Sequence, residues 1–150
     1  MTPRLAERGE LGAVLALIQQ SFAYMEARID PPSSMHRLTV EALADPAHEV
    51  WGLGTPVWAC VVLTPQENDL YLGKLAVAAD RRSSGFGRAL VTHAEDRAVA
   101  LGLPAVELQV RVELTENQRA FEKMGFAKVG ETAHPGYDRA TSITMRKELG

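Results

Sequence analysis

Residues 75–90 read LAVAADRRSSGFGRAL, and this stretch decides how the chain folds. Its apolar first part is typical of a buried strand, and the glycines at 85 and 87 stand where a turn opens a long helix. The first N–H groups of a helix have no partner within the helix, and the helix dipole favours an anion beside them. A strand that runs through a glycine-rich turn into a helix therefore predicts a phosphate-binding site.

The residues of this turn support the same interpretation. Gly85 and Gly87 carry no side chain that would hold a phosphate away from the backbone. Charged and hydroxyl side chains that could add to the binding are Arg82, Ser83, Ser84 and Arg88. The alternative is that two glycines merely allow tight packing at a helix start. The segment is not a P-loop or a dinucleotide fingerprint, because it lacks the lysine of the first and the third glycine of the second.

Hydrophobic periodicity predicts the elements on either side. Helices are expected at residues 9–24, 40–44, 85–101 and from 115 to the glycine at 125, the last opening with a capping box at Thr115–Gln118. Strands are expected at residues 48–53, 57–63, 70–78, 106–112, 126–131 and 141–147. This order predicts an α/β (α+β) fold in one domain, residues 1–150, with a mixed, mostly antiparallel central sheet and helices on both faces.

Composition limits the classes of function. The chain has 150 residues and a net charge of −3, and mild acidity argues against a nucleic-acid partner. Cys60 is the only cysteine and lies in an apolar run, which predicts a buried thiol and a reducing, cytoplasmic environment. The sequence has no apolar run long enough to cross a bilayer and no signal-peptide pattern, so no membrane partner is expected.

Two motifs together resemble the GNAT acetyltransferase superfamily. The first is Leu75-x-Val77 followed by Arg82-x-x-Gly85-x-Gly87-x-Ala89-Leu90, and the second is the run ENQRAFEKMGF at residues 116–126, which ends in Gly-Phe. The resemblance covers nearly the whole chain and is firmest over residues 70–126. It implies an N-acetyltransferase that uses acetyl-CoA as co-substrate, needs no metal, and acetylates the primary amine of a small molecule by direct attack in a ternary complex.

The resemblance also implies where acetyl-CoA binds. In the family, the strand that matches residues 75–77 splays from the strand that matches residues 106–112, and the pantetheine arm lies between them. A backbone N–H of the first strand would polarise the acetyl carbonyl. The residues that the resemblance assigns to acetyl-CoA are Leu75, Ala76, Val77, Arg82, Ser83, Ser84, Gly85, Phe86, Gly87, Arg88, Asn117 and Phe121.

The positions for proton transfer depart from the family pattern. The family often has a tyrosine four residues before the glycine of Gly-Phe, which protonates the leaving thiolate, but this chain has Phe121. Tyr137, His134 or a water molecule could supply the proton instead. The family's base often lies where this chain has Gln109, which leaves Glu107 and Glu113 as candidates. The catalytic candidates are thus Glu107, Glu113, His134 and Tyr137, although each also fits an ordinary surface or turn position.

The acceptor side is the least specified by the sequence. By resemblance it is built from the first helices, their loop and the last hairpin, which suggests Tyr24, Arg28, Trp51, Lys74 and Arg139. A homodimer is possible. Because Phe121 and Gln109 stand where the family has proton-transfer residues, a non-catalytic acyl-CoA sensor remains an alternative function. A protein N-terminal or lysine acetyltransferase and a different phosphate-binding protein remain further alternatives.

Overall fold

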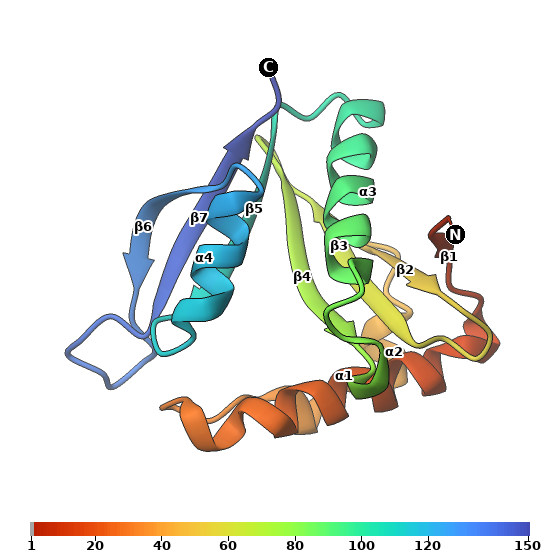
Figure 1. Cartoon of the computed structure of the whole chain (residues 1–150), viewed down its shortest axis with the longest axis horizontal. Coiled ribbons are helices and arrows are strands. Elements are labelled where there is room, and N and C mark those ends of the chain that lie inside the picture. The colour runs from red at the N-terminus through yellow and green to blue at the C-terminus, as the bar shows by residue number, and fades with distance from the viewer. Residues whose placement is uncertain (1) are drawn as a thin grey trace.

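The computed structural model describes residues 2–150, in which seven strands form one open mixed sheet (Figure 1). The strands are β1 (Arg4–Leu5), β2 (Glu49–Leu53), β3 (Ala59–Pro65), β4 (Leu70–Val77), β5 (Ala105–Arg111), β6 (Ala127–Thr132) and β7 (Ser142–Glu148). The α-helices are α1 (Leu11–Met25), α2 (Val40–Leu43), α3 (Phe86–Ala100) and α4 (Thr115–Lys123). The predicted fold class is confirmed.

The sheet runs in the order β1-β2-β3-β4-β5-β7-β6, and all neighbouring strands except β4 and β5 are antiparallel. The parallel pair is very short, since it joins only Leu70 to Val106 and Tyr71 to Glu107. Beyond Tyr71 the two strands separate, as Figure 1 shows between the yellow-green β4 and the teal β5. The splayed strands that the resemblance implies are therefore present.

Helices cover both faces because β3 is apolar on both sides. Cys60 and Val62 are buried in the cluster that α1 forms on one face. Val61 and Leu63 are buried on the other face, in the cluster that contains the buried residues of α3. This alternation is what a strand between two helical layers requires. Burial also raises the pKa of the Cys60 thiol to about 12, so the prediction of a buried thiol is confirmed.

Two local features differ from the sequence-based predictions. The strand β1 pairs with β2 through Arg4 and Leu5 alone, too short a segment to carry a periodic pattern. The capping box at Thr115–Gln118 is wrong, because Thr115 is the first residue of α4 and Leu114 is its N-cap without a side-chain bond. The Gln118 amide turns back and donates to two carbonyls of the preceding turn.

Three structural features lie at the same end of the sheet. In Figure 1, the separation of β4 and β5, the first turn of α3 and the first turn of α4 all lie toward α1. The helix α1 packs against β3 and β4, and its last turns extend beneath the gap toward α4. None of the helices described within residues 2–150 is both long and apolar enough to span a membrane.

Candidate functional site

A bulge interrupts β4 midway along the strand. The register against β3 shifts between Cys60 and Val62, and Lys74 on β4 has a left-handed φ of 52°. A bulge bends its strand and increases the local twist. It lies just beyond the point where β4 loses its pairing with β5, so the bend accompanies the separation of the strands. A lysine is not a residue that favours positive φ, and the sequence therefore held no signal for this feature.

Beyond the bulge, β4 presents backbone groups to the gap. The Ala78 N–H donates to the Trp58 carbonyl at 2.8 Å, which marks a hydrogen-bonded pair with β3. Because such pairs alternate along antiparallel strands, the backbone groups of Val77 face away from β3. The Arg82 Nε supports this geometry by donating to the Val77 carbonyl at 3.1 Å. Val77 is therefore the residue of β4 best placed to bond a ligand in the gap.

The turn before α3 fits an anion such as a pyrophosphate. Gly85 is the N-cap of α3 at a φ of 84°, and no side chain caps the helix. Ser83 also has a positive φ, of 67°. A Cβ placed on Gly85 or Gly87 would meet no atom within 4 Å, so open space lies beside both glycines. The first N–H groups of α3 are donors without side-chain partners, which is the donor set that a phosphate needs.

Aromatic rings hold the arginines of this turn. The Arg81 guanidinium lies 4.4 Å from the centre of the Trp58 ring, and that of Arg82 lies 4.9 Å from the ring centre of Tyr24. Trp58 in turn packs edge to face against Phe86. Tyr24, which the sequence predicted for the acceptor side, therefore contacts Arg82 of the turn before α3. Arg88 is exposed on the first turn of α3.

A second group of residues gathers where β5 ends, around Asp30 in the loop after α1. One carboxylate oxygen of Glu113 accepts from the Asp30 N–H at 3.1 Å, and the other is buried with no hydrogen-bond partner. The Tyr137 hydroxyl donates to the Asp30 carboxylate at 2.7 Å, and Arg139 contacts the same carboxylate at 3.1 Å. The bond to Asp30 raises the pKa of Tyr137. Candidates far apart in sequence, Glu113, Tyr137 and Arg139, are thus brought together.

The first turn of α4 faces the same loop region. Arg28 makes a bidentate ion pair with Glu116, with one bond of 2.9 Å. Asn117 follows, half-buried. Phe121 lies in the next turn and packs edge to face against Phe126, with ring centres 5.7 Å apart. The pair of Arg28 and Glu116 therefore joins the end of α1 to α4 across the open end of the gap.

The other candidates lie elsewhere. His134 bonds to the Thr141 hydroxyl within the β6–β7 connection. Trp51 packs against His93 of α3 and donates to Glu49, so it does not join the residues around Asp30. Lys74 borders a shallow depression that is also lined by residues of the α1–α2 connection.

Glu107 lies at the closed end of the gap, opposite Tyr71. The carboxyl of the buried Asp69 raises the pKa of Glu107 by hydrogen bonding, and burial adds to the effect. Arg146 contacts both acids, Asp69 at 3.1 Å and Glu107 at 3.4 Å. These groups tie β4, β5 and β7 together at the point from which the two parallel strands diverge.

We expect Arg146→Met to destabilise the protein by about 2 kcal/mol at pH 7, because it leaves two adjacent carboxyls without their cation. A carboxyl with a raised folded pKa contributes stability below its unfolded pKa and loses it as pH rises through the folded value. The loss of unfolding free energy in Arg146→Met, relative to the wild type, should therefore shrink as pH falls from 7 toward 4.5. Urea unfolding at both pH values measures it, with the exposed Arg119→Met as control. An equal deficit at both pH values would contradict this account.

Comparisons with known proteins agree with this geometry. A model of the acetyltransferase (GNAT) family matches residues 17–126, which is more than half of the chain. No curated protein matches the sequence significantly. Each of the three solved structures described next is less than 25% identical to this chain, so its likeness supports the fold alone.

Three of these structures illustrate the likeness. An aminoglycoside 6′-N-acetyltransferase complexed with coenzyme A is 16% identical, with a TM-score of 0.77 over 100% of this chain and 98% of that one. The ribosomal-protein-S18-alanine N-acetyltransferase from Escherichia coli is 21% identical, with a TM-score of 0.70 over 99% and 94%. A spermidine N-acetyltransferase from Vibrio cholerae in complex with CoA and spermine is 20% identical, with a TM-score of 0.73 over 99% and 95%. With the family match over residues 17–126, the chain belongs to the GNAT acetyltransferase family and is an N-acetyltransferase.

Proposed function

We propose that residues 1–150 act as a single domain that transfers the acetyl group of acetyl-CoA to the primary amine of a small molecule, by direct attack in a ternary complex. The observation that carries the proposal is the loss of pairing between β4 and β5 beyond Tyr71, next to the uncapped start of α3. A gap with free backbone groups and an adjoining anion site suits a ligand whose long, flexible arm is attached to a pyrophosphate.

The co-substrate would supply the acetyl group as a thioester. Residues 82–88 would bind its pyrophosphate through the first N–H groups of α3 and the arginines held at the turn. Val77 would bond the arm through its outward backbone groups, and Leu75 and Ala76 would line the same path. Asn117 and Phe121 would border the arm from α4. This assignment makes the Arg82 bond to the Val77 carbonyl a contact that the arm would replace.

Among the catalytic candidates, the geometry favours Glu113 as the base. Its Oε1 has no hydrogen-bond partner within residues 2–150, so it would accept the amine proton once the acceptor displaces the atoms that bury it, while its other oxygen is held by the Asp30 N–H. Glu107 is less available because Arg146 and Asp69 surround it. A base matters because a lysine-like amine, with a pKa of about 10.4, is neutral in only roughly one molecule in a thousand at pH 7.

Departure of the thiolate needs less assistance from protein side chains than deprotonation of the amine. A thiol has a pKa of about 8.5, so its thiolate can depart near neutral pH without an acid. Phe121 has no proton to give, and the Tyr137 hydroxyl is already bonded to Asp30. Tyr137, His134 or water would protonate the thiolate after it departs. We therefore place proton removal from the amine, rather than proton donation to sulfur, at the centre of the mechanism.

The proposed acceptor side lies between α1, the loop around Asp30 and the β6–β7 connection. Arg28 and Arg139 border this region, Lys74 lies on the depression beside the α1–α2 connection, and Tyr24 joins the region to the turn before α3. The similar structures include enzymes named for aminoglycosides and spermidine and one named for a ribosomal protein. We favour a small acceptor because the pockets beside this region hold only about 250 and 290 Å³.

Release of free thiol from acetyl-CoA in the presence of small amines tests the proposal. We expect turnover with some primary amines and none without an amine. We also expect acetyl-CoA at 100 times its Kd to stabilise the fold by about 2.7 kcal/mol in a thermal-shift assay. Stabilisation without thiol release would favour the acyl-CoA sensor. No stabilisation at millimolar acetyl-CoA would exclude the function altogether.

A further inference from the structure

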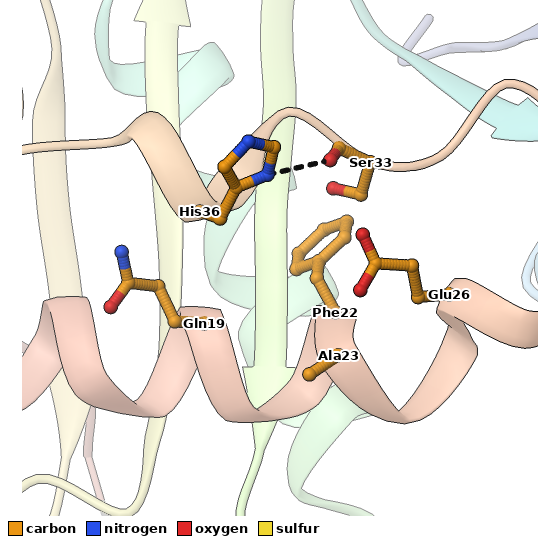
Figure 2. Close-up of a pocket in the computed structure, with 6 residues that line it drawn as sticks. All are labelled: Gln19, Phe22, Ala23, Glu26, Ser33 and His36. Atoms are coloured by element: carbon orange, nitrogen blue, oxygen red, sulfur yellow. Dashed lines mark hydrogen bonds between the residues drawn. The ribbon is translucent and has the colours of Figure 1, made fainter.

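A pocket of about 250 Å³ lies between α1 and the short segment that follows the Asp30 loop. Its lining residues, all drawn in Figure 2, are Gln19, Phe22, Ala23, Glu26, Ser33 and His36. None of the residues assigned above to acetyl-CoA or to catalysis lines it. The pocket therefore needs an explanation of its own.

The polar groups in the pocket favour a positively charged ligand. The Glu26 carboxylate has neither a hydrogen bond nor an ion pair within residues 2–150, and the nearby Arg28 is paired with Glu116. Figure 2 shows the Glu26 carboxylate turned toward Phe22 and Ser33. A carboxylate beside an aromatic ring provides both an ion pair and a cation–π contact, the two interactions that an ammonium group makes best.

The far wall of the pocket is already fixed in place. The Nδ1 of His36 contacts the Ser33 carbonyl at 3.1 Å, and since a carbonyl only accepts, this nitrogen carries the proton. The Ser33 hydroxyl accepts from the Met35 N–H at 3.1 Å, and Gln19 donates to the Met35 carbonyl at 3.3 Å. These bonds hold the segment against α1, so the Glu26 carboxylate is the charged group that remains for a ligand.

The pocket is also joined to the proposed reaction site. Phe22 packs against the buried cluster that includes Ala76 of β4. On the other side, the loop that carries Ser33 is bound near Asp30 by Glu113 and at the Pro31 carbonyl by Arg111, which donates at 2.6 Å. A molecule seated in the pocket therefore lies along the loop that Glu113, the proposed base, contacts at the Asp30 N–H.

We infer that this pocket binds a second, non-reacting ammonium group of the acceptor, so that the acceptor is a linear diamine or longer polyamine rather than a monoamine. The inference rests on the proposed function and specifies its substrate class. The ammonium would contact the Glu26 carboxylate and the face of the Phe22 ring, while the reacting amine at the other end reaches the gap near Glu113.

Kinetics with 1,5-diaminopentane and pentylamine tests the inference. We expect Glu26→Gln to lower the ratio of the two kcat/KM values, diamine over monoamine, by about fivefold, since the ion pair with an exposed carboxylate is lost while the Phe22 ring remains. The statistical advantage of two reactive ends cancels when this ratio is compared between proteins. The matched control is Glu41→Gln, which removes an exposed carboxylate of α2 outside the pocket and should leave the ratio as in the wild type.

Direct binding separates this inference from the proposed function. Tetramethylammonium cannot be acetylated, and calorimetric titration should show about fivefold weaker binding to Glu26→Gln than to the wild type, because only the ion pair is lost. If the wild type binds this probe through Glu26 but acetylates neither amine, the pocket assignment stands and small-amine transfer fails. An unchanged kinetic ratio together with equal probe binding by wild type and Glu26→Gln overturns the inference.

Discussion

Gly87→Glu is expected to weaken acetyl-CoA binding by at least about 100-fold while the protein stays folded. A side chain at this position would enter open space, because a Cβ there meets no atom within 4 Å. The substitution adds a carboxylate where the pyrophosphate is expected, so its charge would repel the phosphates and occupy the anion site of α3. Glutamate also forms helices better than glycine, so the variant loses no stability through helix propensity.

Isothermal titration with acetyl-CoA measures this effect, and Gly12→Glu provides the matched control. Gly12 also lies near the start of a helix, α1, and a Cβ there likewise meets nothing within 4 Å. The control makes the same chemical change away from the phosphate turn, so its affinity for acetyl-CoA should match that of the wild type. A folded Gly87→Glu variant with wild-type affinity would show that acetyl-CoA does not bind at the start of α3.

Glu113→Gln is expected to lower kcat about 100-fold at pH 7, the lower end of what general acid–base catalysis contributes. Glutamine has the shape of glutamate, and its amide oxygen can still accept from the Asp30 N–H, as the Glu113 carboxylate does. The substitution therefore removes the proton acceptor while it keeps the loop in place. A rate loss would be chemical rather than structural in origin.

The pH dependence separates a base from a structural role. The neutral fraction of an amine with a pKa of about 10.4 grows about tenfold per pH unit between pH 7 and 9, so the need for a base declines. The ratio of wild-type kcat to Glu113→Gln kcat should therefore fall between pH 7 and 9. Tyr137→Phe serves for comparison, because the Tyr137 hydroxyl, which donates to Asp30, takes no part in removing the amine proton, and any rate loss that it causes should not narrow. A Glu113→Gln deficit that is constant with pH would assign Glu113 to positioning alone.

The sequence predicted the phosphate turn because local backbone physics governs that element. A glycine that adopts positive φ and a helix that starts beyond it follow from residues close together in the chain, and Gly85 has both properties. Helical and strand periods likewise predicted α1, α3 and β5 to within about two residues at either end. The same local reasoning failed at Thr115, where Leu114 is the N-cap instead.

The arrangement of the candidate site around the turn depends on contacts between distant residues. Glu113 is separated from Asp30 by 83 positions, and Tyr137 from Asp30 by 107, so no local pattern could join them. Trp51 and Tyr24 show the same limit from the opposite side. The sequence grouped both with the acceptor, and only the structure shows that Trp51 packs on His93 of α3 and that the Tyr24 ring lies against Arg82.

The sequence alone thus determined the family, the mixed sheet and the glycine turn before α3, because each is encoded in short-range spacing. Only the tertiary structure decided that β4 bulges at Lys74 and that Val77 turns its backbone to the gap. It alone placed Glu26 without a partner beside Phe22. The physical reason is that the directions of backbone and side-chain groups depend on which strands and loops pack together, and local propensity does not encode that choice.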